Sequence, residues 1–225
     1  MNLLADLTPG QQLRAPRLPR RLVQLLLGLW LYGASMAMMV ESQLGLDPWD
    51  VFHEGVSGGL PLTFGSVVIL TGVGVLLLWL PLRQTPGLGT VANVVVIGVA
   101  SDVTLGLLER PDGLAARSVL LVAGVVLNGL AGALYIGAQL GPGPRDGLMT
   151  GLVRRTGWSV RRVRTSLEVT VLALGFVLGG TVGLGTVLYA VAIGPLLQLF
   201  LPRAVVPLEA AASQRLPAWL SAGSR

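Results

Sequence analysis

The sequence contains no cysteine and no lysine, and its only histidine is His53. Without cysteine, disulfide frameworks, cysteine zinc sites and thiol nucleophiles are excluded. One histidine argues against a histidine metal site and against a serine–histidine triad. Among the other residues, neither clustered carboxylates nor a nucleophile with a neighbouring base stands out. The sequence therefore predicts neither an enzyme nor a metal or cofactor site.

Charged residues are also scarce, at 12% of the chain, whereas soluble domains carry roughly 25%. Hydrophobic residues make up 52%, and the mean hydropathy is +0.73. The charges are grouped between long apolar stretches, which indicates an integral membrane protein whose first partner is the lipid bilayer. The arginines flank these stretches, so orientation in the bilayer explains the basic composition better than nucleic-acid binding does.

Six segments are apolar over about 20 residues, the length needed to cross a bilayer. They lie at 22–40, 64–81, 88–108, 118–138, 164–182 and 185–202. The 31 glycines suit closely packed membrane helices. If the N-terminal tail (1–21) is cytoplasmic, all arginines except Arg110 and Arg117 fall on that side. We therefore expect a multi-pass cell-membrane protein with both termini cytoplasmic, the C-terminal tail being 203–225. Residues 1–13 and 204–225 are expected to be poorly ordered.

The sequence matches itself, without a gap, after a shift of 96 residues, the step from Gly45 to Gly141. Residues related by this shift are called repeat mates below. The matches include Gly45, Pro48, Asp50 and Gly55 with Gly141, Pro144, Asp146 and Gly151, and Gly87-Leu88-Gly89-Thr90-Val91 with Gly183-Leu184-Gly185-Thr186-Val187. Apolar residues match by composition alone, but glycine, proline and aspartate in the same order indicate a true internal repeat.

Each copy contains three predicted spans, the first at 22–108 and the second at 118–202. Because three is odd, the second copy must enter the membrane from the opposite side, and the arginine distribution requires the same. The predicted fold is an all-α membrane protein of six transmembrane helices in two inverted three-helix repeats. Transporters of this architecture bind their substrates near the midplane, where the halves meet.

A short helix is predicted between the first and second span of each copy. Asp47 or Gly143 is the capping residue, and Pro48 or Pro144 takes the first helical position, where a missing N–H has no cost. Some ten residues cannot cross the bilayer, so each helix is expected to lie on the interface or to be re-entrant.

Asp50 and Asp146 occupy the third position of these helices and allow two interpretations. A carboxylate there complements the helix dipole and reaches back to the cap. Alternatively, the two acids line vestibules on opposite faces and bind a substrate. The external copy carries Trp49 where the internal copy carries Arg145. For the arginines near 145–164, membrane topology and anionic lipid are the simpler explanation, and a substrate-phosphate site is the other.

The segment from Leu44 to His53, together with Gly87-Leu88-Gly89-Thr90, resembles the YczE/YitT-like bacterial membrane proteins. The resemblance covers roughly residues 22–202. It implies a polytopic protein of the bacterial inner membrane and supplies no mechanism. Only the proline and the aspartate of the motif carry over to the second copy.

Polar residues inside the spans need a reason, since an ionisable group costs about 2.5–3.5 kcal/mol there on insertion scales. Asp102 is either a rim residue paired with a neighbour or an ion or proton site. Glu168 is expected to pair with Arg164 at the cytoplasmic interface or to serve a site, and Asn93 and Asn128 to form interhelical hydrogen bonds. With these groups we include Gln198 and Tyr189, the repeat mates of Asp102 and Asn93. We predict that Asp102, Asn93, Asn128 and Glu168 point inward.

Three classes of function can be compared with the sequence. Inverted repeats, glycine-rich helices, Pro195 in the last span and intramembrane polar groups favour a transporter of a small molecule or ion. Few polar residues and short loops fit a non-transporting scaffold or regulator equally well, and nothing supports a membrane enzyme. A polar cavity between the halves would favour the transporter, and a dry centre would favour the scaffold. The sequence leaves the substrate, the coupling ion and the oligomeric state open, a homo-oligomer included.

Overall fold

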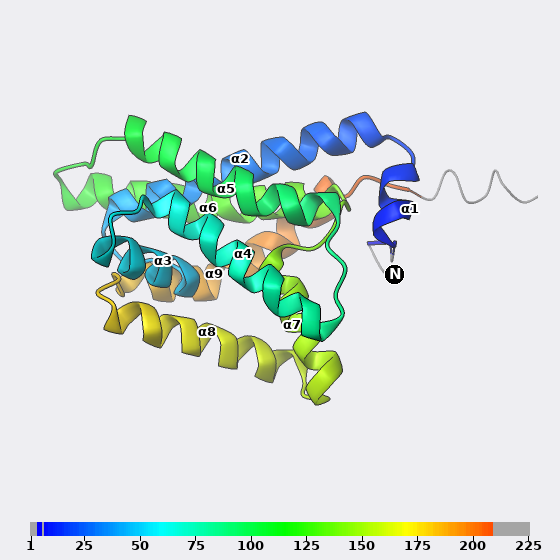
Figure 1. Cartoon of the computed structure of the whole chain (residues 1–225). Coiled ribbons are helices and arrows are strands. Elements are labelled where there is room, and N and C mark those ends of the chain that lie inside the picture. The colour runs from blue at the N-terminus through cyan, green and yellow to red at the C-terminus, as the bar shows by residue number, and fades with distance from the viewer. Residues whose placement is uncertain (1–3, 6, 209–225) are drawn as a thin grey trace, which may run out of the picture.

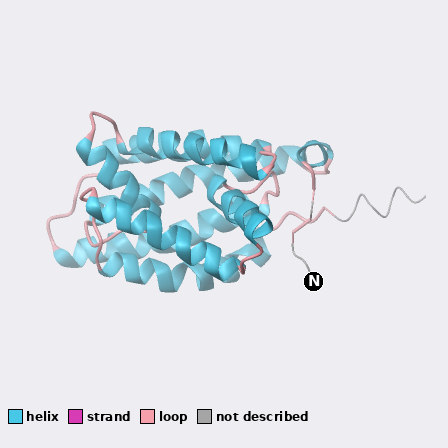
Figure 2. Ribbon diagram, turned by 60° about the horizontal axis from the view of Figure 1, so that its bottom comes forward, coloured by secondary structure: helices cyan, strands magenta, loops and turns pink. Residues whose placement is uncertain are grey.

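The computed structural model describes residues 4, 5 and 7–208, and every regular element in that part is a helix (Figures 1 and 2). The helices of these residues are α1 (Pro9–Arg14), α2 (Leu18–Ser42), α3 (Pro48–Gly59), α4 (Phe64–Leu82), α5 (Leu88–Leu107), α6 (Leu114–Gly137), α7 (Pro144–Thr156), α8 (Val160–Val177) and α9 (Leu184–Ala204). Five of them, α2, α4, α5, α6 and α9, are long and apolar enough to cross a membrane. The helix α8 is not in this group, since Arg161, Arg162, Arg164 and Glu168 lie in its first half.

A helix lies at each of the six predicted spans, with bounds that differ by a few residues. The largest shift is at 164–182, where α8 begins and ends earlier than predicted. It begins at Val160 because the Ser159 side chain accepts a hydrogen bond from the N–H of Arg162 and caps the helix. It ends at Val177, shortly before Gly179, whose φ of 96° is left-handed and stops a right-handed helix.

The two short helices begin at the predicted prolines, Pro48 and Pro144. At about 1.5 Å per residue they are too short to cross a hydrocarbon core of about 30 Å. Figure 1 shows α3 toward one end of the bundle and α7 toward the other. Thr63 caps α4, the helix that follows α3, by accepting a hydrogen bond from the N–H of Ser66.

The helices α2 and α6 pack against each other along the middle of the bundle, with α5 on α2 and α9 on α6. The short helices cross over between the halves, because α3 packs on α8 and α7 packs on α4. The buried side chains of α2, among them Leu25, Leu29, Met36 and Met39, form much of the core. The two halves of the chain are therefore interleaved rather than placed side by side.

Two arginines that are repeat mates make equivalent hydrogen bonds at opposite ends of the α2–α6 pair. Arg21 donates from Nε and Nη2 to the carbonyl oxygens of residues 138–139, at 2.8 and 2.6 Å. Arg117 donates from Nε and Nη2 to the carbonyl oxygens of residues 42–43, at 2.6 and 2.9 Å. The accepting carbonyls lie just past, or at, helix ends, where they lack a partner inside the helix.

Two glycines in the connections before the short helices have left-handed backbones, Gly45 with φ of 112° and Gly141 with φ of 125°. The carbonyl just before each glycine accepts a hydrogen bond of 2.7 Å, from the N–H of Gly185 at Gly45 and from that of Gly89 at Gly141. Glycine is required here because other residues rarely adopt this φ. The same connection is therefore built twice, each time against the first turn of a helix from the other half.

One pair of equivalent helix crossings differs between the halves. On the α4–α7 side the Trp79 ring fills the space beside Gly147, and its Nε1 donates a 3.0 Å hydrogen bond to the Pro144 carbonyl. The repeat mate of Trp79 is Gly175, which packs directly on the backbone of residues 51–52. A tryptophan thus separates α4 from α7, whereas α8 and α3 meet backbone to backbone.

Large apolar side chains remain on the outside of the long helices. They include Leu77, Leu80, Leu107, Val119, Val177 and Leu184. Such a surface is unstable in water and suits lipid chains.

The chain next to both termini is better ordered than the sequence predicts. Residues 9–14 form α1, and Arg21 holds it by donating a 2.6 Å hydrogen bond to the carbonyl of Gln12. After α9 the chain returns to the bundle, where buried Val206 donates to the carbonyl of Gly137 at 3.0 Å. The expectation of poor order is therefore wrong for these segments, and its remainder, 1–3, 6 and 209–225, lies outside the described residues. Figure 1 shows α1 and residues 205–208 at the same end of the bundle.

Candidate functional site

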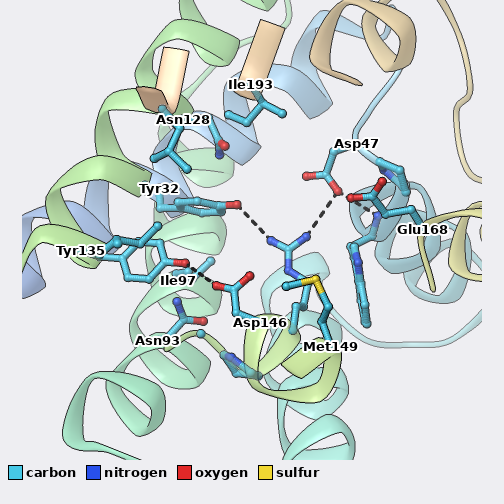
Figure 3. A pocket seen from close by; sticks show the side chains of 18 of the residues that line it. Tyr32, Asp47, Asn93, Ile97, Asn128, Tyr135, Asp146, Met149, Glu168 and Ile193 are labelled. Atoms are coloured by element: carbon cyan, nitrogen blue, oxygen red, sulfur yellow. Dashed lines mark hydrogen bonds and ion pairs between the residues drawn. The ribbon is translucent and has the colours of Figure 1, made fainter. Parts of the chain in front are cut away.

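A cavity of about 200 Å³ lies where the two halves of the chain meet (Figure 3). Residues of α2, α3 and α5 to α9 form its walls, and the first turns of α3 and α7 both reach it. Its polar lining consists of Tyr32, Asp47, Asn93, Asn128, Tyr135, Arg145, Asp146, Arg164, Glu168 and Tyr189. A cavity with a few converging polar groups is the default place for a ligand.

The carboxylate that caps α3 belongs to Asp47, at the N-cap position. Its Oδ1 accepts hydrogen bonds from the N–H groups of Trp49 at 2.8 Å and Asp50 at 3.2 Å. The side chain is almost fully buried, and its Oδ2 has no hydrogen-bond partner among the described residues. The interpretation of Asp50 as the residue that reaches back to the cap is wrong, because its carboxylate lies against His53 and accepts no hydrogen bond from the N–H of Asp47 among the described residues.

Asp50 points away from the cavity instead. Its Oδ1 lies 3.1 Å from Nδ1 of His53, and its Oδ2, like that of Asp47, has no partner among the described residues. Asp50 does not line the cavity, so the vestibule interpretation fails for this acid as well.

The two carboxyl groups titrate unusually, and both lie outside the long spanning helices. Burial raises the pKa of Asp47 to about 7; the neighbouring Asp50 raises it too, while Arg145 and two backbone N–H groups lower it. Burial raises the pKa of Asp50 to about 6, against the lowering effect of Arg145 and of a hydrogen bond with Asp47. Asp47 therefore binds and releases a proton near neutral pH, and in its protonated form it is a hydrogen-bond donor.

Arg145 reaches across the cavity from α7 to residues of the first half. Its guanidinium contacts both Tyr32 and Asp47, two residues labelled in Figure 3. Nη2 donates a 3.0 Å hydrogen bond to the Tyr32 hydroxyl, and Nη1 is 3.7 Å from Asp47 Oδ1, beyond hydrogen-bond range. The guanidinium also lies 5.5 Å from the centre of the Trp49 ring, a cation–π distance. Trp49 and Arg145 are repeat mates that differ in type, and the contact between their side chains connects the two short helices.

Asp146 faces the same cavity from α7. Its Oδ2 accepts a hydrogen bond of 3.2 Å from the Tyr135 hydroxyl on α6. Asp146 does not reach back to cap its own helix, because its carboxylate is turned toward α6 and no hydrogen bond joins it to the N–H of Gly143 among the described residues. Of the two predicted acids, this one lies in the cavity.

Asn128 forms the interhelical hydrogen bonds that the sequence predicted. Its Nδ2 donates to the Ser35 hydroxyl on α2 at 2.9 Å, and its Oδ1 accepts from the Tyr189 hydroxyl on α9 at 3.0 Å. Asn93 lines the cavity too, and no such hydrogen bond is seen for it within the described residues.

Glu168 lies at the exposed side of the cavity. It accepts a 2.9 Å hydrogen bond from Nε of Arg164, the predicted i,i+4 pair, with the two side chains 40% and 58% exposed. Both residues also line the cavity. Glu168 therefore pairs with Arg164 and points inward at the same time.

Asp102 does not face the cavity, and the prediction that it points inward is wrong. Its Oδ1 accepts a 2.7 Å hydrogen bond from the N–H of Gly65, and its Oδ2 accepts one from Thr63. Asp102 thus caps α4 from α5, because the first N–H groups of α4 need acceptors. This is the pairing with a neighbouring helix that the sequence left as the alternative.

Several lining residues escaped the sequence reasoning. The sequence indicates only a helix cap for Asp47. It gives no sign of a site at Tyr32 and Tyr135, because a tyrosine in an apolar span is typical of a core residue. One signal was available: Tyr32 and Asn128 are repeat mates, and so are Asn93 and Tyr189, so a polar residue recurs at the same two positions of each copy. Among the described residues, no group of three histidine or acidic side chains could hold a metal ion.

These features define a multi-pass membrane protein with a polar cavity inside its helical bundle. The chain belongs to the family of unknown function DUF6198, whose model matches residues 19–202. It is 42% identical over 177 residues to an uncharacterised protein of Haemophilus influenzae, with 79% of this chain and 81% of the relative covered. It is 34% identical over 195 residues to the uncharacterised membrane protein YczE of Bacillus subtilis, with 85% and 90% covered. The predicted relation to YczE-like proteins is confirmed. No solved structure matches the chain.

Proposed function

We propose that this protein is a secondary transporter of a small solute, which binds in the cavity between the two halves. The polar cavity carries the proposal. A scaffold needs only a packed centre, and a cavity holding polar side chains inside an apolar bundle is costly unless it binds something. Its volume of about 200 Å³ suits a molecule of a few heavy atoms.

We further infer six transmembrane helices in two inverted halves, with α8 as the sixth span. The equivalent hydrogen bonds of Arg21 and Arg117 support this arrangement, as do the matching contacts at Gly45 and Gly141. The helix α8 occupies the place in the second half that α4 has in the first, and its last nine residues are apolar except for Thr170 and Gly175. The arginines then put both termini on the cytoplasmic side of the inner membrane.

In inverted-repeat transporters the halves exchange roles, so that the site opens to one side at a time. Here the halves differ where α3 meets α8 and α4 meets α7. The backbone contact at Gly175 makes the first crossing close, and the Trp79 ring makes the second wider. We propose that the structure corresponds to a state closed at the α3–α8 crossing, and that the opposite state closes α7 on α4 by moving Trp79.

The proposal is tested by measuring the melting temperature of the purified full-length chain in detergent with a panel of small anions, cations, zwitterions and neutral solutes. A transporter is stabilised by its substrate through mass action, by about 2.7 kcal/mol at a hundredfold excess over Kd. Any solute that stabilises the protein is then tested for uptake into proteoliposomes. If no solute stabilises the protein or is taken up, the scaffold or regulatory role is favoured.

A further inference from the structure

Resting on the transport function proposed above, we propose that the cavity binds a small monoanion, such as a carboxylate, on Arg145, and that Asp47 takes up a proton when the anion binds. The proposal combines three observations: donors on Arg145 that have no acceptor, a carboxylate oxygen on Asp47 that has no donor, and the loose pairing of the two residues.

Arg145 is the anion-binding group. A guanidinium has five N–H donors in a planar fork that fits a carboxylate. Within the part of the chain that the structure describes, the only hydrogen bond it donates goes to Tyr32. Its side chain is 34% exposed and lines the cavity. Nη1 faces Asp47 at 3.7 Å, beyond hydrogen-bond range, so the donors other than the one bonded to Tyr32 have no acceptor among the described residues, and an anion in the cavity can satisfy them.

The charges of the cavity limit the anion to a small one of single charge. Arg164 is already paired with Glu168 at the exposed side. Arg145 is then the lining arginine with the looser ion pair, at 3.7 Å from Asp47, and Asp146 is its neighbour along α7. Once Asp47 is protonated, the charges of Arg145 and Asp146 balance. A second negative charge on the ligand would be repelled by Asp146 without a further cation to bind it, so a monoanion fits better.

Asp47 is the proton-binding group. Its Oδ2 is buried without a partner, and so is Oδ2 of Asp50. Neither atom is reached from the cavity, so a solute cannot satisfy them. A proton can, because protonated Asp47 becomes a donor to Asp50. The pKa of about 7 places this proton in the physiological range.

The two binding events are linked through the Asp47–Arg145 pair. While Asp47 is ionised it attracts Arg145 and repels an incoming anion. Protonation removes both effects and releases the guanidinium for the anion, so proton and anion favour each other's binding. The other titratable groups that face Asp47 from the surrounding helices are Tyr32, Asp50, His53, Glu168 and Tyr189.

The test uses the purified full-length protein with acetate, glycolate and lactate as probes, their amides as neutral isosteres, and ethylammonium as the cation. The carboxylates are expected to raise the melting temperature, and their amides are not. With one proton taken up per anion, affinity should weaken about tenfold per pH unit above about pH 7. Proteoliposomes should take up the bound carboxylate faster when the outside is more acidic.

Two substitutions separate the roles, each with a matched control. Arg145→Gln should weaken carboxylate binding by roughly 10- to 100-fold, whereas Arg154→Gln, exposed on the same helix, should not.

Asp47→Asn keeps a good helix cap and imitates the protonated acid. Its carboxylate binding should persist and become independent of pH, and Asp112→Asn, at an exposed site, should keep the pH dependence of the wild type.

The outcomes distinguish this inference from the transport function. Stabilisation and uptake of the cation or of an amide, without any effect of carboxylates, would overturn the anion site and leave transport standing. Carboxylate binding that is independent of pH in the wild type would overturn the role of Asp47. If no probe binds and none is taken up in either assay, both proposals are overturned.

Discussion

Single residues of this protein show why burial alone does not identify a site. Asp47, Asp50 and Asp102 are all acids in or near the apolar bundle. Both carboxylate oxygens of Asp102 accept hydrogen bonds from the start of α4. Asp47 and Asp50, in contrast, each have one oxygen without a partner among the described residues. The unsatisfied atom, rather than the charge itself, indicates a group with something left to bind.

Replacing Asp102 with alanine should lower stability and leave transport intact. The substitution removes the acceptor for the N–H of Gly65 and for the Thr63 hydroxyl, a cap worth about 1 kcal/mol. The measurement is the melting temperature in detergent, together with uptake per folded molecule of any solute that stabilises the wild type. Asp112→Ala, at an exposed position, is the control that should change neither. A loss of uptake without a loss of stability would return Asp102 to the site.

At the scale of helices, one residue sets the spacing at each crossing of a short helix. Trp79 fills the α4–α7 crossing and hydrogen-bonds to the first turn of α7, while its repeat mate Gly175 lets α8 touch α3 directly. Two crossings with the same sequence motif therefore differ in width. The difference is the asymmetry between helices on which the proposed alternating access depends.

Gly147→Ala should destabilise the protein by about 1–3 kcal/mol, the usual cost of overpacking. A Cβ at this position would overlap the Trp79 ring, which is nearly fully buried and has no room to move. The matched control is Gly74→Ala, a helical glycine on α4 with open space around it, which should be neutral or slightly stabilising. Unfolding of both variants in detergent by heat gives the comparison, and equal melting temperatures would contradict the tight packing of Trp79 on Gly147.

At the scale of the whole molecule, the proposed inverted arrangement predicts that repeat mates are exposed on opposite sides of the membrane. Leu60 and Thr156 are such mates, and both are exposed beside the ends of α3 and α7. Since the chain has no cysteine, Leu60→Cys and Thr156→Cys each carry one reactive thiol without further engineering. An impermeant maleimide added to intact cells should label the first, and the second should react only after the membrane is opened.

Thr85→Cys serves as a second internal marker, since it lies in the connection between α4 and α5. It should behave like Thr156→Cys. Labelling of Leu60→Cys and Thr156→Cys from the same side would remove the inverted arrangement, and with it the alternating-access proposal.

Much of the fold could be read from the sequence because its determinants are local. The lengths of the hydrophobic segments predicted the bounds of the six long helices to within a few residues, and Pro48 and Pro144 predicted where the short helices begin. The predicted span at 164–182 leaves out the first turn of α8, because the arginines of this turn make a poor membrane span; Ser159 is the cap that marks the start of the helix. The length of an apolar segment indicates how much of a helix contacts lipid. It does not indicate a charged first turn that lies at the membrane interface.

The site was less predictable, because its residues meet only through packing between the halves. The sequence pointed to Asn128, Glu168 and Asp146, which line the cavity, and also to Asp50 and Asp102, which do not. A polar residue in a span has the same sequence signature whether it caps a neighbouring helix or faces a cavity. The partner decides, and the partner lies far along the chain.

The sequence by itself determined the class of this protein, its helices and its internal repeat, since these follow from hydropathy and from residues that act within a few positions of themselves. Only the tertiary structure decided that Arg145 of one half lies between Tyr32 and Asp47 of the other. That meeting depends on how α2, α3 and α7 pack. A distance between residues more than ninety positions apart is fixed by packing, which no local pattern records.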